Sequence, residues 1–289
     1  LRSPSSVLPE VLAIALALSS AISWGSADFL GGLYSRRLPL LAVMFVSQLA
    51  GLAGVLVLVA LTARSGPDPE VLYAALGGAG GVVALTAFYH ALAIGTMSIV
   101  APISATGAAL PVIVGVATGE RPSSLQAVGI AVAVVGVVLA SREIADDAEH
   151  AEAIRLSVGL ALVAALGFGG FLTAMDAASE HSVQWALLSA RSSSVMLLLA
   201  ITLAVSAPRS VPRPDVPGVA AAGLLDLSAN GLFALASTKG LLSVVGVCGS
   251  LYPVTTIVLA RVVLGERVRR VQEVGIGGAL AGVAMIAAG

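Results

Sequence analysis

Six ionisable side chains lie inside long apolar segments of this sequence, where a charge is costly to bury. The acids are Asp28, Asp176 and Asp226, and the bases are His90, Arg191 and Arg261. An ionisable group in such a segment is by default a candidate for ligand binding or proton transfer. The two signs could instead pair completely, as buried ion pairs that fix the register of helices. Both interpretations stay open at this point.

The spacing around two of these acids indicates a binding surface. Asp28 follows Trp24 by four residues, so both side chains project from one face of a helix. A carboxylate beneath an indole suits a cationic or amine-bearing ligand. Asp226 and Asn230 repeat this spacing, and the planar fork of Arg191 suits a carboxylate or a phosphate. A cavity that held both signs would suit a zwitterion such as an amino acid.

Uncharged polar side chains in the same segments add candidates for solute binding. They are Gln48, Tyr89, Ser104, Thr106, Ser250 and Tyr252. Serine and threonine hydroxyls in apolar helices commonly bond their own backbone instead. The set expected to bind solute is Trp24, Asp28, Gln48, Tyr89, Arg191, Asn230 and Tyr252. The set in which proton coupling is considered is Asp28, His90 and Asp226.

Two further acids and one proline are assigned structural roles. Glu120 and Glu266 each stand just before a predicted helix, where a carboxylate accepts hydrogen bonds from unpaired amides and complements the helix dipole. Proton coupling is the alternative role for this duplicated pair. Pro253 removes a backbone donor, so we expect a kink in the helix that contains it.

Composition excludes several classes of protein. Hydrophobic residues make up 58% and charged residues 11% of the chain, whereas soluble domains carry about 25% charged residues. The net charge of −1 favours no nucleic-acid partner, and the single Cys248 excludes an internal disulfide or a cysteine metal cluster. No hydrolase elbow, zinc-protease pair or nucleotide-binding loop occurs. We therefore expect no enzyme activity, no cofactor and no metal.

The candidate residues fall on ten predicted helices, each about as long as the ~30 Å needed to cross a bilayer core. Helices are favoured because lipid offers no partner to an unpaired backbone group. The predicted spans are 9–31, 39–62, 71–93, 97–118, 123–140, 155–177, 183–205, 216–236, 241–264 and 270–288. The sequence starts without methionine and ends in an apolar stretch, which suggests that polar tails flank it.

The chain contains an internal repeat of about half its length. Gly119-Glu120-Arg121 with Gln126 recurs as Gly265-Glu266-Arg267 with Gln272, 146 residues later. Upstream, Ser98-Ile99-Val100 resembles Ser243-Val244-Val245, and Trp24-Gly25 resembles Phe168-Gly169. The units are residues 1–140 and 155–289, joined by a polar linker over 141–154. Because each holds five spans, the second must enter the membrane inverted, with a cavity between the halves.

These residues resemble a known family. Leu251-Tyr252-Pro253-Val254, then Leu264-Gly265-Glu266-Arg267 and Gln272, is similar to the closing signature of the EamA repeat. Two such repeats characterise the drug/metabolite transporter superfamily. The resemblance covers essentially the whole chain, but the first repeat has Gly107 or a neighbour where the signature proline is expected. It implies ten helices in an inverted-repeat bundle, export or exchange of small metabolites, and both termini in the cytoplasm.

The sequence therefore predicts a secondary transporter in the plasma membrane that exports a small metabolite, such as an amino acid, an amine or a drug-like solute, by alternating access. A channel or lipid scramblase, and less so a membrane-embedded enzyme, are the alternatives. The expected partners are the solute and the lipid bilayer, with the chain as a monomer or homodimer. The orientation in the membrane has conflicting evidence. Lys and Arg number four on the side of the termini and nine on the other side, so the positive-inside rule places the termini outside, whereas the resemblance places them in the cytoplasm.

Overall fold

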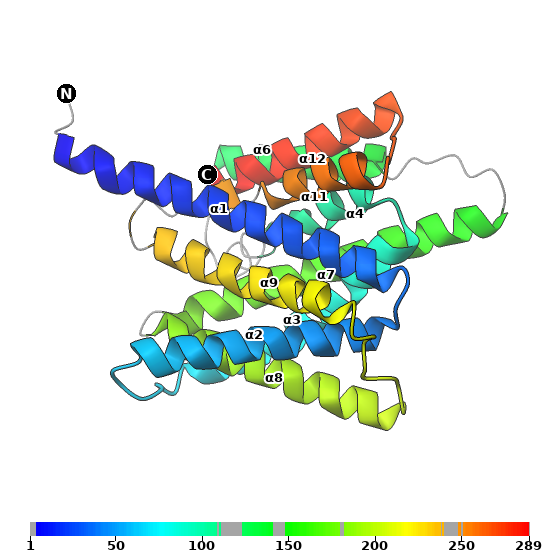
Figure 1. The fold of residues 1–289 in the computed structure, drawn as a ribbon. Helices are drawn as coiled ribbons and strands as arrows, with labels where there is room; N and C mark the ends of the chain where they lie inside the picture. Colours follow the sequence, from blue (N-terminus) through cyan, green and yellow to red (C-terminus); the bar gives the residue numbers. More distant parts are fainter. Residues whose placement is uncertain are drawn as a thin grey trace.

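The computed structural model describes residues 4–108, 110, 123–140, 148–179, 182–237, 239, 248–249 and 251–288. These residues form a bundle of helices (Figure 1), which confirms the all-α architecture. The elements are α1 (Pro4–Ser35), α2 (Leu40–Thr62), α3 (Val71–Ile94), α4 (Met97–Ala105), the 3₁₀ turn η1 (Thr106–Ala108), α6 (Ser124–Ala140), α7 (Ala148–Ser179), α8 (Val183–Ala204), α9 (Val216–Ser237), α11 (Tyr252–Val263) and α12 (Arg270–Ala288).

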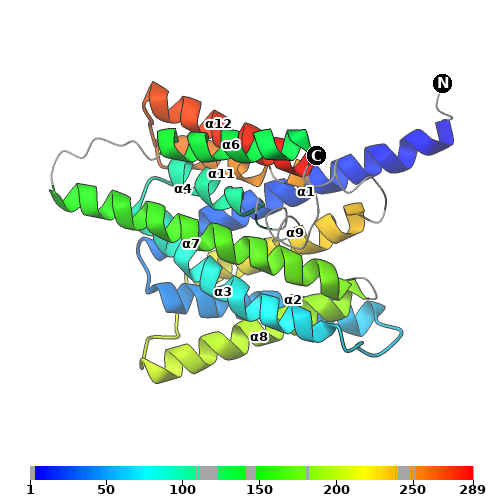
Figure 2. The same ribbon diagram turned by 180° about the vertical axis from the view of Figure 1, so that it is seen from behind.

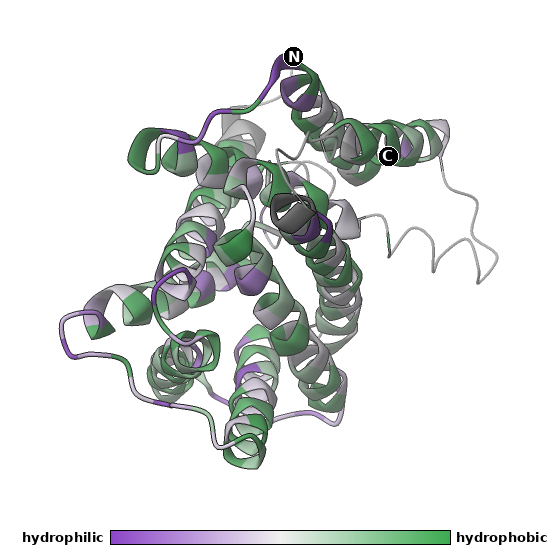
Figure 3. Cartoon of the chain, turned by 90° about the vertical axis from the view of Figure 1, so that its right-hand side faces the viewer, coloured by the Kyte–Doolittle hydropathy of each residue, from purple (hydrophilic) through white to green (hydrophobic). Residues whose placement is uncertain are grey.

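Six of the described helices are long and apolar enough to cross a membrane. These spans are Val11–Ser35, Leu40–Thr62, Val71–Ile94, Glu152–Met175, Val183–Ala204 and Val216–Ala236. Figure 3 shows hydrophobic residues along the helices and the hydrophilic ones gathered mainly in the connecting loops. The chain is therefore a multi-pass membrane protein.

Corresponding helices of the two repeats run in opposite directions. The first helices, α1 and α7, have 32 residues each, and in Figures 1 and 2 they start at opposite ends of the bundle. The packing follows the same relationship, because α1 lies against α9 and α3 lies against α7. Since α7 is the counterpart of α1 and α9 is the counterpart of α3, exchanging the repeats converts one of these helix pairs into the other, as an inverted repeat requires.

The duplicated glutamines begin the last helix of each repeat. At α6, the amide of Ser123 donates to Gln126 Oε1 at 3.0 Å and the amide of Gln126 donates to Ser123 Oγ at 3.1 Å. At α12, the amide of Arg269 donates to Gln272 Oε1 at 2.7 Å. Both glutamines thus satisfy amides that the helix itself leaves unpaired.

The duplicated glycines bring these two helices together. A Cβ atom on Gly136 would collide with the backbone of Ala279, and one on Gly282 would collide with that of Ala133. Figures 1 and 2 both show α6 and α12 side by side at one edge of the bundle. In lipid, where apolar burial drives little association, such close backbone approach provides the packing.

Two predicted spans are interrupted at equivalent positions. Within the predicted span 97–118, α4 ends at Ala105 and the turn η1 follows, while residues 109 and 111–118 lie outside the described part of the chain. In the second repeat Leu251 forms a turn and α11 starts at Tyr252, which is 146 residues after Thr106. Pro253 therefore stands in the first turn of α11, where a missing amide costs nothing, and not in the middle of a continuous helix as the sequence suggested.

The predicted linker is partly helical. α7 begins at Ala148, so the second half of 141–154 extends the first helix of the second repeat. Figure 1 shows this end of α7 reaching beyond the other helices. Residues 141–147 lie outside the described part of the chain.

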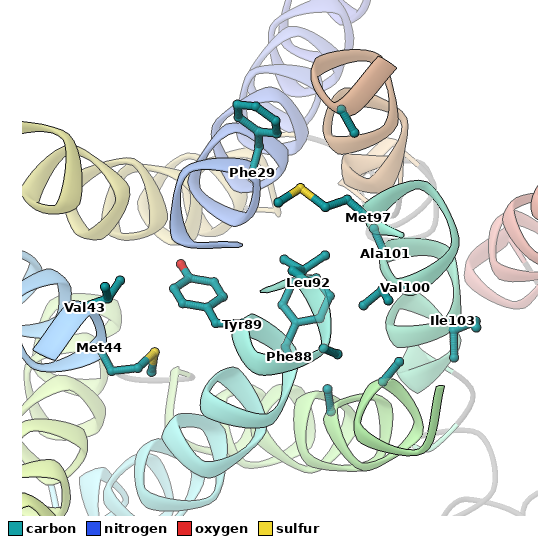
Figure 4. Close-up of a cluster of buried hydrophobic side chains, with 14 of the residues drawn as sticks. Phe29, Val43, Met44, Phe88, Tyr89, Leu92, Met97, Val100, Ala101 and Ile103 are labelled. Atoms are coloured by element: carbon teal, nitrogen blue, oxygen red, sulfur yellow. The ribbon is translucent and has the colours of Figure 1, made fainter. Parts of the chain in front are cut away.

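The main apolar core lies at one end of the bundle, where α1 and α3 finish and α4 begins. Figure 4 shows Phe88, Leu92 and Met97 gathered there between α1, α3 and α4, with Phe29 projecting from the other side of α1, and all four are buried. Toward the other end, the buried clusters among described residues are built mainly of alanines. We call the end of the bundle that contains Phe29, Phe88, Leu92 and Met97 the sealed end.

Candidate functional site

A cavity of about 310 Å³ lies between the two repeats. It receives side chains from α1, α2, α3 and α4 of the first repeat and from α7, α8, α9 and α11 of the second. Of the residues predicted to bind solute or protons, those that line it are Trp24, Asp28, Gln48, Arg191, Asp226, Asn230 and Tyr252. The structure thus brings most of the predicted residues into one space.

Arg191 and Asp226 form an ion pair in this cavity. Arg191 Nη2 donates to Asp226 Oδ2 at 2.5 Å, and Nη1 donates to Gln48 Oε1 at 2.6 Å. The guanidinium lies over Gly51, where a Cβ atom would stand only 3.2 Å from Arg191 Cζ. Three helices therefore hold Arg191, and its charge is already compensated.

Asp28 is the other acid among the described residues that line the cavity. It is 7% exposed, and among the described residues it forms no ion pair. Asp226 lines the same cavity, so a charge on one carboxylate repels a charge on the other. A buried carboxylate without a cation is costly, so this side chain favours a positive ligand or a proton.

Aromatic rings form one wall beside Asp28. The Trp24 ring centroid lies 5.5 Å from that of Phe233 and 6.3 Å from that of Tyr252, with the Tyr252 ring edge-on. Phe168 and Phe171 line another part of the cavity. The sequence reasoning missed these phenylalanines as site residues, although Phe168 is the counterpart of Trp24 in the repeat.

The two interrupted helices meet at the same cavity. Ser104 and Gly107 line it from the first repeat, and Gly249 and Tyr252 line it from the second. The hydroxyls of Ser104 and Tyr252 lie 3.5 Å apart. Interrupted helices in corresponding positions of two repeats are typical of transporter binding sites.

Tyr89, His90 and Arg261 lie elsewhere. Tyr89 does not line the cavity: it is 1% exposed, packs against Gly31 and donates to the carbonyl of Ala27 at 3.4 Å. Gly31 of α1 has no side chain, so the Tyr89 ring packs against it in the sealed end. His90 is exposed on the outside of α3, and Arg261 pairs with Glu273 at 3.3 Å on the surface. The side chain of Asp176 lies outside what the structure describes.

Glu266 binds across the two repeats. Its carboxylate accepts hydrogen bonds from the amides of Met97 and Ser98 at 3.1 and 3.0 Å, and from Ser98 Oγ at 3.0 Å. Arg36 donates to it at 3.0 Å and also to the carbonyls of Leu92 and Gly95. The acid therefore binds the N-terminus of α4, in the other repeat, and not that of the helix that follows it. Glu120 lies outside the described residues.

Comparison with known proteins identifies the family. The model of the EamA-like transporter family matches the chain twice, over residues 11–142 and 155–288. The chain belongs to the EamA-like transporter family. This membership confirms the two repeats, the assignment to the drug/metabolite transporter superfamily and a transporter that typically has no enzyme activity. It leaves the solute and the direction of transport undetermined.

Solved structures share the fold. One, described only as the crystal structure of a protein, superposes with a TM-score of 0.66 over 95% of this chain and 97% of its own, at 12% identity. That similarity shows the fold alone. No curated protein matches the sequence.

Proposed function

We propose that this EamA-like transporter is a secondary transporter that carries a small solute through the cavity between its repeats by alternating access. The cavity supports this most directly, since it combines side chains of both repeats, buried charges and two interrupted helices. All of these side chains belong to one chain, so a monomer suffices for the proposed transport, with a homodimer as the alternative.

The asymmetry between the repeats supports alternating access. At the sealed end α1 packs against α3, with Gly31 against Tyr89 and Gly32 against Leu92. The related pair, α7 and α9, shows no comparable packing in the described residues. In a fused inverted pair, exchanging the two arrangements yields a second state that is closed at the other end.

The sealed end also bears on the alternatives. A channel or a lipid scramblase needs a polar path from one face of the membrane to the other. Here apolar side chains, including Phe29, Leu92 and Met97, fill one end of the bundle (Figure 4). A cavity beside such a core suits a carrier better than a pore.

We further propose export across the plasma membrane, with both termini in the cytoplasm as the family resemblance implies. In that orientation the sealed end faces outward, and the cavity is set to receive a solute from inside. The positive-inside rule argues against this orientation, because the sealed end carries several arginines, among them Arg36, Arg37 and Arg213, and arginines favour the cytoplasmic side. A reporter fused to the C terminus decides the point, since activity only outside the cytoplasm would reverse the orientation.

Exchange in proteoliposomes tests the proposal. Labelled 2-phenylethylamine and labelled phenylalanine are offered outside vesicles that contain the same unlabelled compound. For a carrier, the unlabelled compound inside speeds the uptake of the label, and uptake saturates. Linear uptake that ignores the internal compound indicates a channel, and loss of lipid asymmetry in the same vesicles indicates a scramblase.

A further inference from the structure

The charges of the cavity do not balance. Among the described residues that line it, the ionisable acids and base are Asp28, Asp226 and Arg191. Asp226 and Arg191 neutralise each other through their 2.5 Å contact. When ionised, Asp28 is then one buried negative charge without a partner ion in this part of the chain. The cavity is therefore complementary to a single positive charge.

Arg191 is poorly placed to bind an anion. Both of its terminal nitrogens already donate, to Asp226 and to Gln48, and the residue is 8% exposed. A carboxylate ligand would have to displace Asp226, which would leave a second buried acid unpaired beside Asp28. This geometry argues against the zwitterion that the sequence alone left open.

The surroundings of Asp28 suit an organic cation. Trp24 stands one helical turn away on the same face of α1, and indole is the ring that attracts cations most strongly. Phe233 and Tyr252 extend the aromatic wall beside the indole. Such a wall can hold the apolar body of a ligand whose positive group lies at the carboxylate.

We infer that this cavity binds a small organic monocation, with its ammonium group between Asp28 and Trp24 and its apolar body against Phe233 and Tyr252. The inference rests on the proposed transport function and names the class of solute. The cavity volume of about 310 Å³ stands at the lower end of ligand pockets, so the cation is a small one.

The two tryptophans of the chain make binding measurable. Trp185 lies at the start of α8, outside the cavity, where its indole donates to the carbonyl of Ser65 at 2.8 Å. In a Trp185→Phe background the remaining emission comes from Trp24, inside the cavity. Four probes of similar shape are titrated: 2-phenylethylammonium, the neutral 2-phenylethanol, the anion 3-phenylpropionate and the zwitterion phenylalanine.

The ammonium probe is expected to bind at least ~10-fold more tightly than the alcohol, with the anion weakest. Asp28→Asn is expected to remove this preference, and Asp68→Asn, which alters an acid of the α2–α3 loop, to keep it. Asp226→Asn, which frees Arg191 as a second charge, is expected to shift the preference toward phenylalanine. Benzyltrimethylammonium separates charge from hydrogen bonding, and its binding is expected to depend on Asp28 as well.

Equal binding of the alcohol and the ammonium probe would overturn the inference, as would preference for the anion or an ammonium preference that survives Asp28→Asn. Failure of all probes to change the Trp24 emission would overturn it too. None of these results touches the proposed transport function, which the exchange assay tests separately through its dependence on internal solute.

Discussion

Glu266 and Ser98, which belong to different repeats, are joined by two hydrogen bonds of 3.0 Å at the sealed end. The acid comes from the turn before α12, and the serine stands in the first turn of α4. Arg36, at the end of α1, binds the same carboxylate. One acid thus connects three segments that must separate if this end of the bundle is to open.

We expect Glu266→Gln to weaken the sealed end. The amide keeps the shape but loses the charge that strengthens the hydrogen bonds from Arg36 and the α4 amides, a loss of about 1.5–3 kcal/mol. Thermal melting in detergent measures it. Glu273→Gln is the matched control, because Glu273 pairs with Arg261 on the surface and its loss costs less than about 1 kcal/mol. Equal effects of the two variants would show that Glu266 has no special role.

We expect Arg191 and Asp226 to be strongly coupled in stability. Arg191→Met leaves two buried acids, and Asp226→Asn leaves a buried base, so each single change is expected to cost about 3 kcal/mol. The double variant is expected to cost clearly less than the sum of the two, since it leaves no uncompensated member of the pair. Melting curves for all four proteins provide the cycle. Additive losses would contradict the pairing.

Trp24 is expected to contribute to affinity for cations more than to affinity for neutral compounds. Trp24→Leu removes the ring that faces the positive group, which is expected to cost ~3–30-fold in binding of 2-phenylethylammonium, and Trp24→Phe less. Calorimetric titration measures this without relying on the indole signal. Trp185→Leu is the control that removes the other tryptophan. An equal loss for 2-phenylethanol would assign Trp24 a packing role only.

Much of the fold could be predicted from sequence, because apolar runs near 20 residues are punctuated by charged, Gly and Pro segments. Leu40–Thr62 and Val71–Ile94 lie within one residue of the spans predicted for them. The interruptions at Thr106 and Leu251 could not be predicted, because the residues there remain apolar or neutral and hydropathy does not report the breaks. They depend on the packing of the two repeats against each other.

The site was only partly predictable, for a different reason. Residue type marked Asp28, Arg191 and Asp226 as candidates, but not which acid pairs with the base. That choice is set by how α8 and α9 face each other, with Gly51 making room for the guanidinium. Tyr89 was misplaced since a glycine of α1 draws its ring into the core, a contact 58 residues away in sequence.

The central claim is that an unpaired carboxylate at Asp28 receives the transported solute, and one paired measurement on Asp28→Asn tests it most directly. Exchange of 2-phenylethylamine in proteoliposomes and thermal melting are recorded on the same preparation, with Asp68→Asn as control. We expect exchange to be abolished while the melting temperature stays unchanged or rises, because the variant removes a buried charge that lacks a partner ion. Unchanged exchange would remove Asp28 from the site, and a large fall in melting temperature would show that Asp28 is instead one half of a structural ion pair.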